Sequence, residues 1–177
     1  GPRFAFTDVL NVTSISALSY YTAESSPDSL IAGRVVGELY YLFGSQTIEP
    51  WAQTGNADDP FSLQPGMTQQ VGCACRDGIV RGDNTLFFLD HAFNPRRLGQ
   101  GASEIINPDD PWVTILLKRA GAANIRGKVY EENAHVFVAW RTPIGEVWYD
   151  VLTRQWHTRG TLNTDTSRYT AMVQVGP

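Results

Sequence analysis

The sequence has few lysines, few cysteines and no long apolar run. Of its 14 basic residues only Lys118 and Lys128 are lysines, and the 18 acidic residues leave a net charge of −4 over 177 residues. Nucleic-acid-binding domains usually carry a basic excess that neutralises phosphates, so this balance argues against a dedicated nucleic-acid-binding protein. The best candidate for a membrane span, residues 112–117, is far shorter than the roughly 18 apolar residues that a bilayer requires. We therefore expect no membrane association.

The two cysteines and three histidines do not form a metal-binding pattern. Cys73 and Cys75 are separated by one residue, a spacing that closes a poor disulfide on an extended strand. His91, His135 and His157 lie far apart, and a zinc site would need further ligands at suitable spacing. We expect two small free thiols, no metal and no cofactor. This sparing use of cysteine fits synthesis in a reducing, intracellular compartment.

Alternating apolar and polar residues, bounded by Gly, Asp, Asn and Ser, dominate the chain and predict β-strands. The expected strands are residues 3–7, 30–36, 39–43, 46–51, 78–81, 85–89, 128–130, 135–140, 146–150 and 155–159. Pro50 lies inside one of them. Because proline cannot donate to a ladder, we expect that strand at the edge of its sheet.

The aromatic-rich strands recur at a nearly constant spacing. They begin at Leu39, Thr85 and His135, which are 46 and 50 residues apart. A period of about 40–50 residues with four short strands in each unit is typical of β-propeller blades. We therefore expect an all-β fold with about three four-stranded antiparallel units of the propeller-blade type. An unrelated meander or sandwich, which also places strands at short spacing, is the alternative.

Residues 1–177 are expected to form a single β-rich domain with unit boundaries near residues 53, 107 and 160. Three units leave blade faces uncovered, because propellers usually close with about 4–8 blades. The chain begins with Gly1 instead of Met, and residues 169–175 resemble the first strand of a further unit. We interpret the chain as part of a larger propeller. A three-sheet arrangement closed by oligomerisation is the alternative.

One segment departs from the β pattern and predicts a short inserted helix at residues 111–120. Asp110 is a candidate N-cap, Pro111 occupies the first helical position, and Gly121 follows the end. Acidic residues before the helix and basic residues in its last turn suit the helix dipole. The apolar stripe, which we expect to lie on a sheet or in an interface, consists of Trp112, Ile115, Leu116 and Ala120.

No catalytic motif stands out. The sequence lacks a nucleophile elbow, a Walker loop, a zinc-protease helix motif and a glycine-rich dinucleotide turn. Asp90 and His91 are adjacent, and since adjacent strand residues point to opposite faces, we do not expect them to form a hydrolytic dyad. The acidic pairs at residues 58–59 and 109–110 lie beside prolines and are interpreted as turns or helix starts. We expect no enzymatic activity.

An ordered series of motifs resembles the tail-hub, or packaged-DNA-stabilisation, proteins of short-tailed bacteriophages. The series comprises residues 3–8 (RFAFTD), 23–31 (AESSPDSLI), 43–49 (FGSQTIE), 54–55 (TG), 71–76 (VGCACR), 83–89 (DNTLFFL) and 147–150 with 155–157 (VWYD and QWH). It covers roughly residues 3–160. We expect structural roles for the positions that carry it, which are Glu24, Pro27, Asp28, Phe43, Gly44, Thr47, Glu49, Gly55, Gly72, Cys73, Arg76, Asp83, Asn84 and Phe87. Asp28, directly after Pro27, is expected to cap backbone N–H groups of a turn.

The resemblance implies a mechanical function. Proteins of this family form a ring below the portal and its adaptor, extend the DNA channel, retain packaged DNA and carry the tail needle and spikes. It implies a virion component that self-associates, docks to these neighbours and lets DNA pass without sequence-specific binding. Members of the family are commonly several hundred residues long, so the chain resembles a central part. Residues 91–98 depart from the family, which usually has a longer loop there.

A ligand-binding or carbohydrate-active β-propeller domain is the alternative function, with its site at the channel mouth. An adhesin-like β domain is a third possibility, and surface aromatics clustered in one groove would mark it. The candidates for such a groove are Trp51, Trp140, Trp148 and Trp156. Propeller packing favours the core for these side chains.

Overall fold

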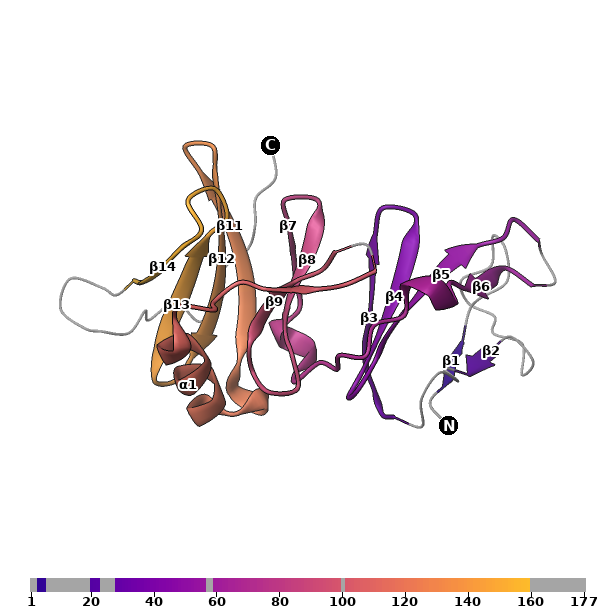
Figure 1. Cartoon of the computed structure of the whole chain (residues 1–177), viewed down its shortest axis with the longest axis horizontal. Helices are drawn as coiled ribbons and strands as arrows, with labels where there is room; N and C mark the ends of the chain where they lie inside the picture. Colours follow the sequence, from indigo (N-terminus) through magenta and orange to yellow (C-terminus); the bar gives the residue numbers. More distant parts are fainter. Residues whose placement is uncertain (1–2, 6–19, 23–27, 57–58, 100, 160–177) are drawn as a thin grey trace. The chain divides into compact units, whose positions relative to one another are not determined.

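Antiparallel sheets account for most of the structure (Figure 1). The computed structural model describes residues 3–5, 20–22, 28–56, 59–99 and 101–159. Within these residues, three four-stranded sheets follow one another along the chain, together with one two-stranded sheet and one short α-helix. The all-β fold of about three four-stranded antiparallel units with one short helix is therefore confirmed.

The strands of each four-stranded sheet are consecutive in sequence. The first sheet contains β3 (Leu30–Val36), β4 (Leu39–Gly44), β5 (Ile48–Gln53) and β6 (Phe61–Leu63). The second contains β7 (Val80–Gly82), β8 (Thr85–Leu89), β9 (Pro95–Arg97) and β10 (Glu104–Ile105). The third contains β11 (Arg126–Glu132), β12 (His135–Thr142), β13 (Gly145–Asp150) and β14 (Gln155–Thr158). The two-stranded sheet pairs β1 (Arg3–Ala5) with β2 (Tyr20–Thr22), and the short 3₁₀ helices are η1 (Pro65–Met67), η2 (Arg76–Gly78) and η3 (Ala122–Asn124).

Two compact units divide the chain, Gly1–Cys73 and Ala74–Pro177. Unit 1 contains the two-stranded sheet and sheet β3–β6, and unit 2 contains sheets β7–β10 and β11–β14 with the α-helix. This division differs from the expected single domain with a first boundary near residue 53. Because β6 pairs with β5, the first sheet continues to Leu63. Strand β6 has only three residues, which are too few for an alternation of apolar and polar residues to be recognised in the sequence.

The second strand of each four-stranded sheet begins where the sequence predicts, at Leu39, Thr85 and His135. In unit 2, the turns before β8 and β12 each hold two consecutive residues at positive φ. They are Asp83 and Asn84, at 48° and 53°, and Asn133 and Ala134, at 50° and 65°. Two positive φ values in succession are the geometry of a type I′ turn, whose twist matches that of the flanking strands.

The core of unit 2 lies between its two sheets and the helix. Its fully buried apolar side chains are Phe87, Leu89, Val113, Leu117, Ile125, Val138, Trp140 and Val147. Burying a side chain of this size contributes roughly 1.5–3 kcal/mol. One specific bond accompanies this packing, because the indole Nε1 of Trp140 donates to the carbonyl oxygen of Gly78 at 2.8 Å. Trp140 is therefore a core residue, as the sequence favours, with an exposed fraction of 0%. Trp148 is also buried, at 4%, but lies outside this core cluster.

The first strands of the two sheets in unit 2, β7 and β11, approach closely at glycines. An ideal Cβ on Gly127 would lie 2.5 Å from Cγ1 of Val80, and one on Gly82 would lie 3.3 Å from Cγ1 of Val129. Neither glycine has a positive φ. Space, rather than backbone conformation, therefore disfavours a side chain at Gly127, whereas a Cβ at Gly82 would require the neighbouring valine side chains to shift slightly.

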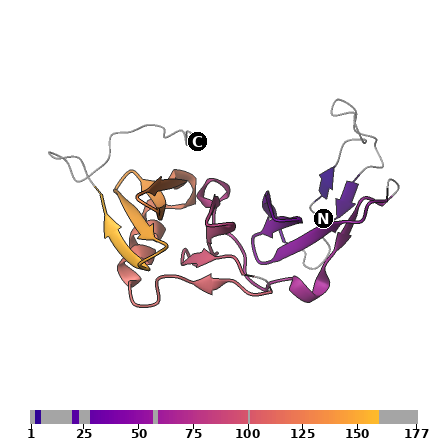
Figure 2. The same cartoon turned by 90° about the horizontal axis from the view of Figure 1, so that it is seen from above.

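Helix α1 (Pro111–Ala120) lies beside β13 in two perpendicular views (Figures 1 and 2). Asp110 occupies the N-cap position but makes no side-chain capping bond, and its Oδ1 accepts a bond from Nε1 of Trp112 at 3.0 Å instead. The expected apolar stripe is wrong in part. The sheets cover the side that carries Val113 and Leu117, so Trp112 and Ile115 remain exposed while Leu116 and Ala120 are half-buried. Among the described residues, no helix has the length and apolar character needed to cross a bilayer.

Pro50 lies in a central strand, so the expectation of an edge strand is wrong. The order β3-β4-β5-β6 places β5 between two neighbours. The carbonyl oxygen of Pro50 accepts a bond from the backbone N–H of Gln64 at 2.9 Å. The carbonyl and the nitrogen of one strand residue face the same neighbour, so the Pro50 nitrogen points toward Gln64, directly after β6. Without an N–H, Pro50 makes no return bond to the Gln64 carbonyl oxygen, which accepts instead from the backbone N–H of Met67 at 3.0 Å.

Candidate functional site

Asp28 lies beside the turn that joins β4 to β5. Its Oδ2 accepts hydrogen bonds from the backbone N–H groups of Gln46 and Thr47, at 2.6 and 2.9 Å, and from the Thr47 hydroxyl at 3.3 Å. The backbone N–H of Ser45 donates to the carbonyl oxygen of Ser29 at 2.9 Å. The carboxylate thus caps backbone N–H groups, as expected, but those of the distant turn between β4 and β5 and not of a turn formed by Asp28 itself.

Two glycines allow the chain to close around this turn. An ideal Cβ on Gly44 would lie 2.3 Å from Oδ2 of Asp28, and one on Gly72 would lie 1.9 Å from the carbonyl oxygen of Ser45. The backbone N–H of Cys73 donates to the carbonyl oxygen of Gly44 at 2.9 Å. Any side chain at either glycine would therefore separate backbone segments that are hydrogen-bonded to each other.

The strand that follows the turn buries two polar motif residues, Thr47 and Glu49, which are 3% and 2% exposed. Between them, Ile48 exchanges two backbone hydrogen bonds with Gln69, each 3.0 Å long. Phe43, directly before the turn, is fully buried. The structure thus gathers a set of the sequence-selected residues into one place, which we call the motif junction: Asp28, Phe43, Gly44, Thr47, Glu49, Gly72 and Cys73.

The other sequence-selected residues lie elsewhere. Gly55 is exposed at a φ of 77°, in the loop after β5. In unit 2, Arg76 is exposed in η2, Asp83 and Asn84 form the turn before β8, and Phe87 is fully buried. Arg97 contacts this turn through a bond of 2.6 Å to Oδ2 of Asp83. Glu24 and Pro27 fall outside the described residues.

Both cysteines are buried and are not joined in a disulfide, as the sequence predicts. Burial raises the pKa of the Cys75 thiol above its usual range. A thiol with a raised pKa is a weak nucleophile at neutral pH, because the thiolate is the reactive form. Among the described residues, no group of three or more His, Cys, Asp and Glu side chains could hold a metal ion.

Asp90 organises a loop. Its carboxylate accepts bonds from the backbone N–H groups of Ala92 and Asn94, both at 2.9 Å, and from Nε of Arg96 at 2.8 Å. Burial alone would raise the pKa of Asp90, but these bonds outweigh it and lower the pKa below its usual value. The adjacent His91 is exposed. All of the bonds that Asp90 accepts thus come from loop residues and Arg96, which gives the carboxylate a role in holding the loop.

One face of sheet β11–β14 places cations over aromatic rings, on the side opposite the core of unit 2. Nζ of Lys128 lies 4.6 Å from the ring centroid of Trp148, and Cζ of Arg159 lies 4.4 Å from the same centroid. Lys128 also donates to Oε2 of Glu146 at 3.0 Å. Burial and the charge of Arg159 lower the pKa of the neighbouring His157. This cluster was not predicted from the sequence, although the strand register places Lys128 and Trp148 in the same row.

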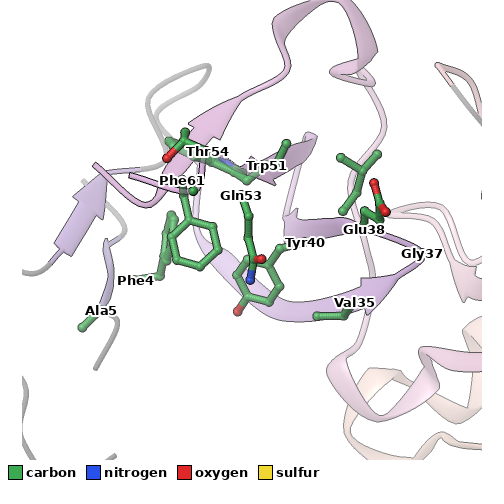
Figure 3. A pocket seen from close by; sticks show the side chains of 13 residues that line it. Phe4, Ala5, Val35, Gly37, Glu38, Tyr40, Trp51, Gln53, Thr54 and Phe61 are labelled. Atoms are coloured by element: carbon green, nitrogen blue, oxygen red, sulfur yellow. The ribbon is translucent and has the colours of Figure 1, made fainter. Parts of the chain in front are cut away.

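A cleft of about 920 Å³ opens in unit 1 between β1 and sheet β3–β6 (Figure 3). Four aromatic side chains line it: Phe4, Tyr40, Trp51 and Phe61. Polar side chains at the cleft include Glu38, Gln53 and Thr54. This cleft was not predicted from the sequence, because Phe4 is far from the other rings along the chain. The sequence contains part of the information needed to predict the cleft. A hairpin of β4 and β5, joined by the turn at residues 45–47, pairs Tyr40 with Trp51.

Comparison with known proteins identifies the family. The family model described as "Bacteriophage P22 Gp10, beta-propeller" matches residues 1–97, which is more than half of the chain. The chain belongs to this phage-stabilisation family. The matched range contains the whole motif junction, and the family description favours propeller blades over an unrelated meander or sandwich. Broadly, the chain is a structural protein of a phage tail. No curated protein matches it.

Proposed function

We propose that the chain is a component of a phage tail hub that links the portal side of the particle to the tail, extends the DNA channel and retains packaged DNA. The observation that carries this proposal is membership of the phage-stabilisation family over residues 1–97. The family is a structural one, and we infer that the chain acts by assembly and not by catalysis.

The packing within unit 2 supports a blade arrangement. Sheets β7–β10 and β11–β14 share one apolar core, and their first strands approach each other at Gly82 and Gly127. Propellers stack successive four-stranded sheets around a central channel in this way. We infer that residues 1–177 are part of a larger propeller, in which further blades cover the faces that this chain leaves open.

The charge distribution suits a channel through which DNA slides. The net charge is −4 and only two basic residues are lysines. The hairpin ends of unit 2 carry the exposed acidic residues Asp83, Glu131 and Glu132. A basic wall would bind phosphates and hold the DNA, whereas an acidic rim repels them. We therefore propose contact with passing DNA without sequence-specific binding.

The proposed partners are those of a tail hub. They are other copies of the chain in a ring, a portal-side adaptor ring above, and tail needle and spike proteins below. The proposed site of synthesis is the cytoplasm of the bacterial host, and the proposed final location is the tail of the virion.

Deletion of the gene tests the proposal. We expect particles that package DNA and then lose it, so that heads recovered from the lysate are empty and their DNA is accessible to nuclease. Complementation with the native gene should restore retention, and complementation with a Gly72→Ala variant, which disrupts the motif junction, should not. A Gly66→Ala gene is the matched control, because a Cβ on Gly66 meets no atom within 4 Å. Particles that retain their DNA and infect normally without the protein would contradict the proposal.

A further inference from the structure

The aromatic cleft of unit 1 has the chemistry of a sugar-binding site. We propose that it binds a neutral saccharide, a function that goes beyond the structural role proposed above. Ligand sites of small molecules have volumes of about 300–1,000 Å³ and combine apolar walls with a few polar groups. The cleft, with about 920 Å³, four aromatic side chains and several hydrogen-bonding groups, has both properties (Figure 3).

Tyr40 provides a fixed platform in the cleft. An ideal Cβ on Gly33 would lie 2.0 Å from the Tyr40 hydroxyl oxygen and 2.5 Å from its Cζ. The ring therefore lies across β3 at a position where any side chain would displace it. Its orientation is set before a ligand arrives, and a rigid aromatic surface binds at low entropic cost.

The other rings form a wall with Tyr40. Phe4 meets Trp51 edge to face, with centroids 5.2 Å apart, and its centroid lies 5.9 Å from that of Tyr40. Phe61 lies 6.3 Å from Phe4. The C–H faces of a pyranose ring are apolar and weakly positive, and they stack on the negative face of an aromatic ring. The cleft thus presents the surface that one side of a sugar ring requires.

The polar groups of the cleft are suited to hydrogen bonds with the hydroxyl groups of a ligand and not to the binding of an anion. Gln53 is exposed and offers an amide that both donates and accepts hydrogen bonds. The hydroxyl of Thr54 already donates to the carbonyl oxygen of Asp59 and accepts from the backbone N–H of Asn56. Glu38 adds a carboxylate acceptor, and none of the lining residues is basic. A phosphate or a nucleic acid would meet only negative charge here. A neutral polyhydroxylated ligand matches both the aromatic and the polar parts.

Trp51 carries a hydrogen-bond donor that the described part of the chain leaves without an acceptor. Its Nε1 is buried and unbonded, although its side chain lines the cleft. Unsatisfied buried donors are uncommon in native structures, and each calls for an explanation. Because this nitrogen has almost no accessible surface, a hydroxyl of a bound saccharide accepts its hydrogen bond only if the indole shifts on binding. The same indole N–H also provides a local signal for a binding experiment.

The test is a titration of the full chain followed by ¹H–¹⁵N NMR of the five tryptophan indoles. The probes are maltotriose, cellotriose, mannotriose and lactose, with sodium phosphate as the anionic comparison. We expect at least one saccharide to shift the Trp51 indole signal saturably, while the signal of Trp148 in unit 2 stays unchanged. Trp51→Phe identifies the signal. The proposal is overturned if no probe saccharide moves the Trp51 signal, or if phosphate moves it as strongly.

Two substitutions at one position separate binding from folding. Tyr40→Ala removes the platform and should weaken saccharide binding by about tenfold, whereas Tyr40→Phe keeps the ring and should leave affinity within about threefold of the native value. Tyr130→Ala in unit 2 is the matched control and should have no effect. Equal binding by Tyr40→Ala and the native chain would refute the proposal.

The remaining alternative occupant is a second copy of the chain. Sedimentation of the same variants distinguishes it. If Tyr40→Ala abolishes self-association and no saccharide shifts the Trp51 indole, the cleft is an interface between copies and the saccharide proposal is wrong. If the DNA-retention experiment fails while the saccharide titration succeeds, the saccharide proposal stands without the tail-hub proposal.

Discussion

The indole Nε1 of Trp140 donates a 2.8 Å hydrogen bond to the carbonyl oxygen of Gly78, across 62 residues of sequence. Trp140 lies on the core face of β12, and Gly78 lies at the end of η2, directly before sheet β7–β10. Both residues are buried, so water cannot replace either partner. This bond therefore fixes how the two sheets of unit 2 are aligned, in addition to the apolar packing that holds them together.

Replacing Trp140 by Phe should destabilise unit 2. The substitution keeps an aromatic ring but leaves the buried carbonyl of Gly78 without its donor, which costs about 1–3 kcal/mol. Urea unfolding followed by near-ultraviolet circular dichroism measures the change. Trp112→Phe is the matched control, because Trp112 also donates an indole bond but is exposed, and we expect a change of about 0.5 kcal/mol or less. Equal stability of the Trp140→Phe variant and the native chain would contradict this prediction.

Replacing Asp28 by Ala should destabilise unit 1. The substitution leaves the backbone N–H groups of Gln46 and Thr47 without their acceptor, and hydrogen bonds to a charged group are worth about 1.5–3 kcal/mol. Asp109→Ala, at an exposed position, should be nearly neutral. The measurement is amide hydrogen exchange, in which Thr47 should lose protection in the Asp28→Ala variant. Unchanged protection at Thr47 would show that the carboxylate does not cap this turn.

Replacing Gly72 by Ala should disrupt the motif junction. The added Cβ would lie 1.9 Å from the Ser45 carbonyl oxygen, which is backbone and cannot rotate away. Overpacking of this kind costs about 1–3 kcal/mol or more. Gly66→Ala, where the added Cβ meets no atom, should leave the thermal midpoint unchanged or slightly raised. A Gly72→Ala variant with the native midpoint would mean that the junction opens at little cost.

The stability of unit 2 should depend on the ionisation of Asp90. Its pKa is lowered in the folded state, because hydrogen bonds from Arg96 and Asn94 outweigh the effect of burial. A carboxyl with a depressed folded pKa contributes stability above its unfolded pKa, near about 4, and this contribution is lost as pH falls further. We expect the free energy of unfolding to fall below about pH 4 more steeply in the native chain than in an Asp90→Asn variant. Denaturant unfolding at a series of pH values measures both slopes, and parallel slopes would contradict the assignment.

Strong local patterns in the sequence predict much of this fold. Residues 30–36 and 85–89 alternate clearly between turn residues, and both strands have the predicted limits. Strand β9 was missed because Pro95, Arg96 and Arg97 show neither alternation nor β-branched residues. Only pairing with β8 and β10 makes this segment a strand.

The candidate sites differ in how far sequence could locate them. The capping role of Asp28 could be predicted from the Pro-Asp dipeptide, but the turn that it caps, at Gln46 and Thr47, could not, because those residues are 18 and 19 positions away. The aromatic cleft depends on Phe4 packing against Trp51, residues 47 positions apart in the sequence, and no local pattern records such a contact. The edge-strand expectation for Pro50 failed for a similar reason, since it depended on where a different strand, β6, ends.

The close approach at Gly127 and Gly82 has a geometric consequence for assembly. In the larger propeller that we propose, two sheets that approach closely at β7 and β11 and enclose large side chains between them would form a wedge. The angle of that wedge sets how many such sheets complete a full circle, and hence the diameter of the hole at its centre. A methyl group on Gly127 would push the narrow ends apart and reduce the wedge angle. In the proposed propeller, the absence of a side chain at this position would thus help to determine the width of the central channel.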